Sequence, residues 1–341
     1  MAIIPHLIVE EYGTFVGKYQ GRLVVTRDKE KLVEAPLMHL ETVLLDGHGV
    51  SISTDALLAC AEHGIPVHIL DSRGAPMASF YASALIGTIQ TRRAQLLAYY
   101  DGRGVEVARS LALGKIRNQA TLLKYIAKYR KEQDPALYDA LREAAIEVTV
   151  HEREVLALRA EQVDAVREQL LGVEGRAAQV YWAALARVVP ATLEWPGRET
   201  RGATDPFNMA LNYGYGVLYG QVERACVLAG LDPYGGFLHT DRPGKPSMVL
   251  DLIEPYRPAV VDRTVLAMVT RGTALKQDTE GRLEADVRRA IAAKVYERLD
   301  AQAPYQGKKL TLGSILQTQA RELAVFLRGE RPTFEAYVAD W

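Results

Sequence analysis

One histidine and two spaced carboxylates fall close together between residues 239 and 254. His239 follows the glycine-rich loop Tyr234–Phe237, and Asp251 and Glu254 lie in the run Ser247–Arg257. Because the two carboxylates are three residues apart, they share one face if that run is helical. Imidazole nitrogen together with carboxylate oxygens suits Mg²⁺ or Mn²⁺, and the run lacks the thiolates of a structural zinc site. These residues are therefore a candidate divalent-metal site.

A plainer interpretation of the same residues stays open. His239 can be a loop histidine satisfied by its neighbours, and the two carboxylates can be a solvated helix start, since both patterns are common. Pro255 adds a second difficulty, because the residue before a proline is pushed away from helical backbone. Spacing alone therefore leaves open both the metal site and the shared face of Asp251 and Glu254.

A long helix precedes these residues. Asp205 is a good N-cap, Pro206 suits the first helical position, and Gly230 offers a left-handed stop. Apolar residues recur at three- and four-residue steps between these ends, which predicts a helix that crosses a core. Glycines 214, 216 and 220 lie inside this helix, follow no strand and lack the ending of a phosphate loop, so they favour close packing over nucleotide binding.

Three blocks of sequence resemble one known family. The string GLDPYGGFLHTDRPGKPSMVLDLIEPYRPAVVDR, Gly230–Arg263, is similar to the signature of the CRISPR-associated integrase family, the catalytic subunit of the complex that inserts new spacers into a CRISPR array. Two further blocks match in the family's order: Gly172–Ala178 with the following Tyr181 and Trp182, and Asp205–Asn208 with Leu211–Tyr215. A weaker likeness covers nearly the whole chain.

The resemblance implies a metal-dependent DNA endonuclease and integrase that acts by transesterification. It implies Glu174, His239 and Glu254 as ligands of Mg²⁺ or Mn²⁺, with Asp251 close by as a further ligand or base. Family members commonly carry Asp where this chain has Glu254. Without the resemblance, Glu174 is only a carboxylate near a helix N-terminus, where the helix dipole favours an anion.

The resemblance also implies partners. These are double-stranded DNA, as protospacer and CRISPR repeat, a second copy of the chain in a homodimer paired through the sheet domains, and a small second adaptation subunit. Two other functions stay open: a general structure-specific DNA nuclease or repair enzyme with the same metal chemistry, and a non-catalytic DNA-binding scaffold.

Local basic segments predict where DNA is contacted. The stretch Val105–Arg130 is rich in lysine and arginine with few acids, and Tyr125 and Tyr129 add possible stacking surfaces. The alternative for this stretch is a solvated helix face. Arg263, near the candidate metal site, is a further phosphate-positioning group. The candidate DNA-contacting residues are Lys115, Arg117, Lys124, Arg176, Arg242, Lys245 and Arg257.

Composition sets wider limits. The length of 341 residues suggests two domains, and 48% hydrophobic residues are ample for a core. The formal net charge of −1 gives no bulk sign of nucleic-acid binding, so any basic patch must be local. Two cysteines without a CxxC motif fit a reducing cytosol, and hence a cytoplasmic protein. Apolar runs stay well short of the ~18 residues of a membrane span.

The pattern of elements predicts an α+β fold. Short β-like runs separated by glycine turns continue to about Leu85 and predict a small, mostly antiparallel sheet domain with one helix, which begins at 53–55 and stops at Gly64. Beyond this point the chain reads as almost wholly helical. We therefore expect a β-rich dimerisation domain at 1–85 and a helical catalytic and DNA-binding domain at 86–341. Towards the end we expect a turn or hairpin at 278–281, a helix at 284–299, a polar loop at 303–309 and a helix at 312–327.

Overall fold

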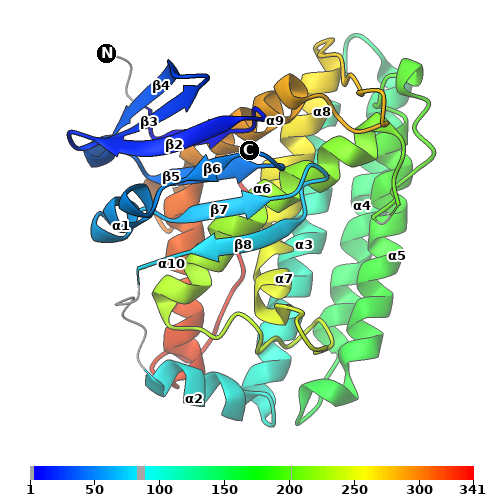
Figure 1. Ribbon diagram of the computed structural model, residues 1–341. Helices are drawn as coiled ribbons and strands as arrows, with labels where there is room; N and C mark the ends of the chain where they lie inside the picture. The colour runs from blue at the N-terminus through cyan, green and yellow to red at the C-terminus, as the bar shows by residue number, and fades with distance from the viewer. Residues whose placement is uncertain (1–3, 83–88, 201) are drawn as a thin grey trace. The chain divides into compact units, whose positions relative to one another are not determined.

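The computed structural model describes residues 4–82, 89–200 and 202–341 (Figure 1). The chain divides into two compact units. Met1–Leu85, Thr200–Gly220 and Ala274–Glu297 form the first, here called the strand-bearing unit. Ile86–Glu199, Gln221–Thr273 and Arg298–Trp341 form the second, the helical unit. Strands come first and helices dominate afterwards, which confirms the α+β class. The predicted domain boundary near Leu85 lies outside the described residues.

The strand-bearing unit holds two four-stranded sheets. In one the strand order is β1-β5-β7-β8, and in the other it is β4-β3-β2-β6. Apolar side chains from both sheets share one core with α1. The bounds are β1 His6–Val9, β2 Thr14–Tyr19, β3 Arg22–Arg27, β4 Glu30–Pro36, β5 Thr42–Asp46, β6 Ser51–Ile52, α1 Thr54–Glu62, β7 Val67–Leu70 and β8 Pro76–Phe80.

The prediction of a mostly antiparallel domain is wrong for half of the strand pairs. β1 with β5, β5 with β7, and β2 with β6 are parallel, whereas β2 with β3, β3 with β4, and β7 with β8 are antiparallel. A parallel pair needs a crossover rather than a tight turn, and α1 lies in the connection from β5 to β7. The signal was present in β5, which is buried at every position, as expected of a central parallel strand.

The long helix α6, Pro206–Ala229, confirms the predicted boundaries. The Asp205 side chain accepts a hydrogen bond from the Asn208 amide, and Gly230 ends the helix with φ +77°. A Cβ at Gly216 would lie 1.7 Å from the Gly74 carbonyl oxygen, and one at Gly220 would lie 2.9 Å from the His68 ring. The glycines therefore let the first part of α6 pack closely on β7 and the turn after it.

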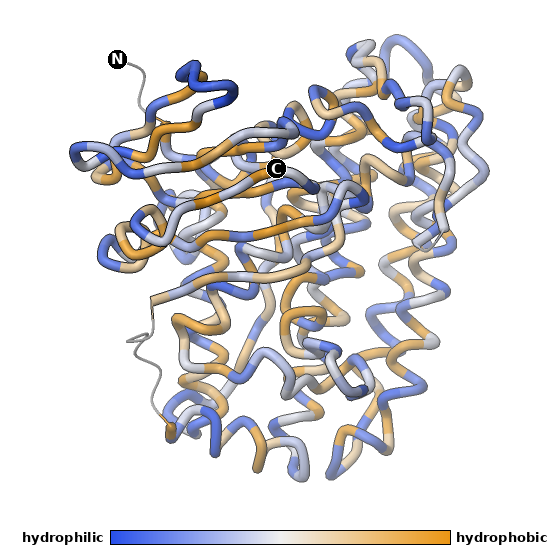
Figure 2. Tube along the Cα trace, in the orientation of Figure 1, coloured by the Kyte–Doolittle hydropathy of each residue, from blue (hydrophilic) through white to orange (hydrophobic). Residues whose placement is uncertain are grey.

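The helical unit is built around α3, Gly102–Lys128, which packs against α4, Pro135–Ala157, and α5, Arg167–Ala186 (Figure 1). Leu111, Ile116 and Leu122 of α3 are fully buried. Apolar and polar positions alternate along these helices (Figure 2). The remaining helical elements before α6 are α2 Ile89–Ala98, η2 Val163–Ala165 and η3 Ala191–Leu193, and η1 Leu37–His39 lies in the strand-bearing unit.

Helical turns lie on both sides of Pro255. α7 spans Ser247–Ile253, a π-helical turn η4 spans Arg257–Asp262, and α8 spans Arg263–Thr270. Glu254 keeps helical angles (φ −55°, ψ −46°) and its amide donates to the Asp251 carbonyl at 3.3 Å. Asp251 and Glu254 therefore share a helical face, although a proline follows. Pro255 has no N–H to continue the ladder, and the wider π turn begins two residues later, at Arg257.

The last third of the chain matches three of four expectations. An antiparallel bridge joins Gln277 to Leu283 around the predicted turn, and the helices are α9, Ala285–Asp300, and α10, Leu312–Leu327. The predicted polar loop at 303–309 is wrong, because β9 Gln302–Tyr305 and β10 Lys308–Thr311 form a hairpin. Gln306 and Gly307 both have positive φ, the requirement of a two-residue turn that Gly307 signals. Across the described ranges, no helix has the length and apolar character to cross a membrane.

Candidate active site

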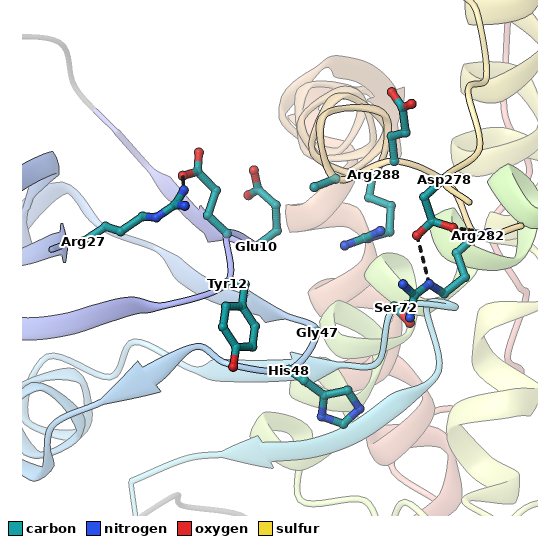
Figure 3. A pocket seen from close by; sticks show the side chains of 12 residues that line it. Glu10, Tyr12, Arg27, Gly47, His48, Ser72, Asp278, Arg282 and Arg288 are labelled. Atoms are coloured by element: carbon teal, nitrogen blue, oxygen red, sulfur yellow. Dashed lines mark hydrogen bonds and ion pairs between the residues drawn. The ribbon is translucent and has the colours of Figure 1, made fainter. Parts of the chain in front are cut away.

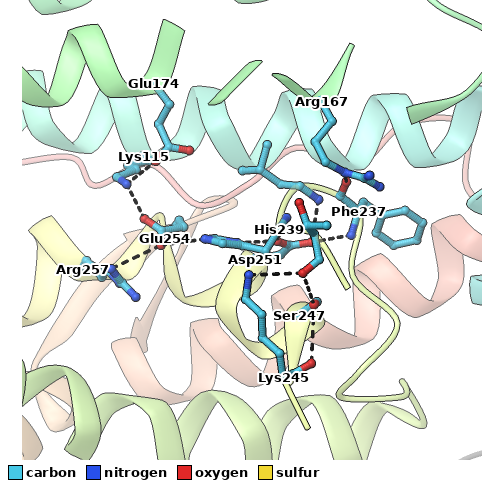
Figure 4. A network of polar contacts seen from close by, with 12 residues as sticks. Lys115, Arg167, Glu174, Phe237, His239, Lys245, Ser247, Asp251, Glu254 and Arg257 are labelled. Atoms are coloured by element: carbon cyan, nitrogen blue, oxygen red, sulfur yellow. Dashed lines mark hydrogen bonds and ion pairs between the residues drawn. The ribbon is translucent and has the colours of Figure 1, made fainter. Parts of the chain in front are cut away.

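Asp251 ties the glycine-rich loop to α7 (Figure 4). Its Oδ2 accepts from the amides of Phe237 at 2.5 Å and Leu238 at 2.9 Å, and its Oδ1 accepts from the His239 amide at 2.8 Å. The His239 Nδ1 lies 2.7 Å from the same Oδ1. A carboxylate only accepts, so Nδ1 carries the hydrogen and the lone pair is on Nε2. Asp251 is fully buried and orients the imidazole.

Gly236 allows the loop to approach α7 this closely. A Cβ at Gly236 would lie 2.5 Å from the Ser247 Cβ and 3.0 Å from Asp251 Oδ2. Real Cβ atoms do not come this close, so a larger residue would push the loop, and His239 with it, away from Asp251. The paired glycines before Phe237 were the sequence signal for this approach.

Two further carboxylates meet one lysine next to His239. The Lys115 Nζ, from α3, lies 2.6 Å from Glu254 Oε2 and forms a second ion pair with Glu174. His239 Nε2 is 3.9 Å and Arg257 Nη1 is 3.4 Å from Glu254 Oε1. The Glu254 side chain is 2% exposed and that of Lys115 14%. Residues from α3, α5, the loop and α7 thus converge on one buried point.

The prediction that Glu174 lies near a helix N-terminus is wrong. The helix α5 begins at Arg167, two turns earlier, so Glu174 lies in its interior, where the terminal dipole has no effect. Gly172 and Gly175 are both helical residues. The glycines suggested a later helix start, but burial of the apolar face of α5 against α3 and α4 outweighs their weak helix propensity.

Lys115 and Glu254 carry their charges at neutral pH. Burial lowers the pKa of Lys115, but the charges of Glu174 and Glu254 outweigh burial and raise it above its usual value. Burial raises the pKa of Glu254, but the charges of Arg257, Lys115 and His239 outweigh it, and the net shift is downward. For His239, burial lowers the pKa and the hydrogen bond to Asp251 raises it, with a net increase.

The donor set fits a hard divalent cation. Glu174 and Glu254 supply carboxylate oxygens and His239 supplies Nε2, the mixture that suits Mg²⁺ or Mn²⁺. Within the part of the chain that the structure describes, Glu174 Oε2 is buried and has no hydrogen-bond partner. The ammonium of Lys115 contacts both carboxylates, so one positive charge already lies between them.

Asn118 fixes the backbone next to Glu254. Its Nδ2 donates to the carbonyl oxygens of Pro255 at 2.6 Å and Tyr337 at 2.9 Å, and its Oδ1 accepts from the Ala339 amide at 2.7 Å. Asn118 is fully buried. Sequence reasoning missed this residue, because its partners are backbone atoms far along the chain and no motif marks them.

The predicted DNA-contacting residues are spread out. Lys115 and Arg257 lie in the carboxylate cluster. Arg117 pairs with Glu152 at 2.8 Å, and Arg176 pairs with Glu154 at 2.5 Å. The others do not join the cluster: Lys124 and Arg242 are exposed, and Lys245 donates to the Thr240 carbonyl at 3.2 Å.

A pocket of about 460 Å³ in the strand-bearing unit is a weaker candidate (Figure 3). Three arginines that line it are each paired with a carboxylate. Arg27 contacts Glu11 at 3.2 Å, Arg282 contacts Asp278 at 3.0 Å, and Arg288 contacts Asp46 at 2.8 Å. His48 lines this pocket too, but no described histidine there pairs with a carboxylate as His239 pairs with Asp251, so we place the candidate active site in the helical unit.

Comparisons with known proteins agree with this fold. The family described as CRISPR associated protein Cas1 matches residues 7–297. A CRISPR-associated endonuclease Cas1 from Archaeoglobus fulgidus is 38% identical, over 98% of this chain and 99% of the relative. A solved casposase bound to integration product has a TM-score of 0.82 at 22% identity, covering 97% of this chain and 93% of that chain. A chain of a solved Cas6-RT-Cas1–Cas2 complex has a TM-score of 0.73 at 23% identity, covering 97% of this chain and 36% of that longer chain.

At 22% and 23% identity, the likeness to these solved structures shows the fold alone. The family model and the curated relative together define the class of CRISPR-associated endonucleases. The chain belongs to the Cas1 family, which confirms the resemblance drawn from the three sequence blocks.

Proposed function

We propose that this chain is a metal-dependent DNA endonuclease and integrase, which inserts short foreign DNA segments as spacers into a CRISPR array by transesterification. One observation carries the proposal: Glu174, His239 and Glu254 come from three separate elements and meet in one buried cluster. A fourth residue, Asp251, is committed to holding the imidazole.

Each residue has a role in this chemistry. Glu174, His239 Nε2 and Glu254 would hold Mg²⁺ or Mn²⁺, which stabilises the negative charge that builds on the attacking and leaving oxygens of a phosphodiester. Asp251 keeps the Nε2 lone pair directed at the site, because it accepts from Nδ1. Arg257, beside Glu254, is placed to contact a nonbridging phosphate oxygen.

Transesterification exchanges one phosphodiester for another. A 3′-hydroxyl attacks phosphorus, its proton is lost, and the displaced strand leaves with its own 3′-hydroxyl. This exchange needs no nucleotide hydrolysis, and hence no nucleotide-binding loop. The glycines of α6 pack against neighbouring backbone and do not form such a loop.

We propose double-stranded DNA and a small second adaptation subunit as partners, in the cytoplasm. A casposase with an integration product and a complex that contains Cas1 and Cas2 share this fold, which supports the proposal. The net charge of −1 supports it too, because a near-neutral chain has few unpaired cations with which to hold two DNA molecules.

We also propose a homodimer that pairs through the strand-bearing unit. Phe15 and Tyr19 lie on the same face of β2, and their side chains are 46% and 62% exposed. Large exposed apolar side chains on a sheet gain from burial by a partner. The double substitution Phe15→Glu and Tyr19→Glu is expected to convert the dimer to a monomer in sedimentation. A dimer of unchanged stability would contradict this contact.

The reaction is tested with a branched DNA that resembles a half-integrated intermediate, supplied with Mn²⁺ or Mg²⁺ and no ATP. The proposal predicts that the freed 3′-hydroxyl is joined to the adjacent strand, and that chelation of the metal stops the joining. Nicked products without a rejoined strand, across metals and salt concentrations, would instead favour the general nuclease. Binding without any turnover would favour the scaffold.

A further inference from the structure

The loop that carries His239 is held by a buried side chain of α2, that of Gln95. The Gln95 Nε2 donates to the carbonyl oxygens of Asp232 at 2.9 Å and Gly235 at 2.7 Å, and the Oε1 accepts from the Asp232 amide at 2.7 Å. Gln95 is 1% exposed. Three hydrogen bonds from one carboxamide therefore fix the turn Asp232–Gly235 relative to α2.

The turn closes tightly around this amide group. A Cβ at Gly235 would lie 3.1 Å from Gln95 Nε2, closer than most real Cβ contacts. Within the turn, the Asp232 side chain accepts from the Tyr234 amide at 2.8 Å, and the Asp232 carbonyl accepts from the Gly235 amide at 3.3 Å. The turn is thus ordered by its own hydrogen bonds and anchored by Gln95.

The same turn contacts the start of α7. The Pro233 carbonyl accepts from the amide of Met248, in the first turn of α7, at 3.0 Å. Asp251 lies three residues further along α7 and accepts from the amides of residues 237–239 and from His239 Nδ1 (Figure 4). A displacement of the turn would therefore disturb the hydrogen bonds that orient His239.

Arg167 of α5 contacts the loop from a third helix. The Arg167 Nε donates to the Phe237 carbonyl at 3.2 Å, and the Nη2 donates to the hydroxyl of Tyr99, the residue after α2, at 2.8 Å. Glu254 is held independently of this loop, by Lys115 and by the bond from Asn118 to the Pro255 carbonyl. The loop and the carboxylates thus have separate supports.

We propose that Gln95 is a positioning residue for His239. By fixing the turn Asp232–Gly235, Gln95 keeps His239 Nε2 beside the Glu254 carboxylate, while Gln95 itself contacts no cation. Groups behind a metal ligand fix its orientation, and their loss weakens metal binding. Because the carboxylates have other supports, loss of Gln95 removes the nitrogen ligand first. This inference rests on the proposed function, since it takes a divalent cation as the cofactor.

The test is electron spin echo spectroscopy of the full chain with Mn²⁺, which detects the nitrogen nucleus of a manganese-bound imidazole. Gln95→Met is expected to remove most of the nitrogen modulation and to weaken Mn²⁺ binding about tenfold, while Mn²⁺ stays on the carboxylates. His239→Ala supplies the reference spectrum without nitrogen. Gln319→Met is the matched control, because Gln319 is a buried glutamine of the same unit that donates to the Tyr305 hydroxyl and the Glu335 carbonyl instead.

A second measurement needs no metal. Hydrogen exchange in EDTA, followed by mass spectrometry of peptides that cover 232–239, reports whether the loop is held. The amides of residues 237–239 should exchange about tenfold faster in Gln95→Met and at the original rate in Gln319→Met. If Gln95→Met melts early, Gln95→Glu replaces it, because this change keeps the shape and the acceptor for the Asp232 amide and removes the amide nitrogen.

The outcomes separate this inference from the proposed function. Original nitrogen modulation in a folded Gln95 variant would overturn the inference, whether exchange is faster or unchanged, because the imidazole would then be positioned without Gln95. If the unsubstituted chain itself binds Mn²⁺ without nitrogen modulation, the proposed ligand set fails and this inference fails with it. Loss of the modulation and faster exchange in the Gln95 variant, with neither in Gln319→Met, would support the inference.

Discussion

Each unit of the chain buries a carboxylate beside a cation, and the two arrangements differ in the donor groups that they bring together. In the strand-bearing unit, Asp46 accepts from Arg288 at 2.8 Å and from the Tyr213 hydroxyl at 2.7 Å, which joins β5, α9 and α6. In the helical unit, Glu174 and Glu254 share Lys115, and Glu254 Oε1 also lies 3.4 Å from Arg257 Nη1. An arginine and a phenol on one aspartate hold segments together, whereas two glutamates beside an imidazole nitrogen supply the donor atoms that a divalent cation takes. The first arrangement is structural and the second is suited to a cation.

The largest expected effect separates catalysis from folding. Glu174→Gln, His239→Ala and Glu254→Gln are each expected to lower strand joining by about a thousandfold, because several kcal/mol of charge stabilisation are lost with the metal. The thermal midpoint should fall less in His239→Ala, which leaves the ion pairs of Lys115 in place, than in Glu174→Gln or Glu254→Gln, each of which removes one of them. Rates on the branched substrate and melting curves test this. Full activity in His239→Ala would refute the assignment of the site.

The converse is expected in the strand-bearing unit. Asp46→Ala leaves Arg288 buried without its counter-ion, which costs about 3 kcal/mol of unfolding free energy. Urea denaturation measures this loss, and the fraction that remains folded should still join strands at a normal rate. An unchanged free energy of unfolding would show that the ion pair of Asp46 with Arg288 does not stabilise the fold.

A smaller effect tests the lysine between the carboxylates. Lys115→Met is expected to tighten Mn²⁺ binding about tenfold or more, because a unit charge within a few ångströms opposes the cation by about 4 kcal/mol near a protein surface. Titration calorimetry gives the affinity without any turnover. Lys124→Met, an exposed position on the same helix, is the matched control. Weaker binding in Lys115→Met would show that the ammonium orders the carboxylates instead.

The smallest effect concerns the two thiols, one in each unit. Burial raises the pKa of Cys60 to about 11 and also raises that of Cys226. Neither should react with a disulfide reagent at pH 8 in the native protein, because the thiolate is the nucleophile and both groups are fully buried. As urea is added, the order in which they react would report which unit opens first. Rapid reaction of either thiol without denaturant would contradict its burial.

Local patterns predicted much of this molecule. Asp205, Pro206 and Gly230 marked the ends of α6, and the three-residue step from Asp251 to Glu254 placed both on one face. The convergence of Lys115, Glu174 and Asn118 on Glu254 could not be predicted from the residues, because helix packing brings together positions some 60 to 140 residues apart. The parallel strands were missed for a related reason, since strand pairing depends on crossovers and not on local alternation.

The π-helical turn Arg257–Asp262 sets the rotation around the helix axis between Glu254 and Arg263. A π turn holds one more residue than an α turn, so it advances every later side chain by about 100° around the helix axis. Glu254 lies before this insertion and Arg263 lies after it. Deleting one residue from the turn would restore a regular α-helix, yet it would point Arg263 away from its hydrogen-bond partner Tyr125 while Glu254 stayed in place. The length of this short segment is thus as constrained as its composition, because an insertion or deletion there would turn Arg263 without moving Glu254.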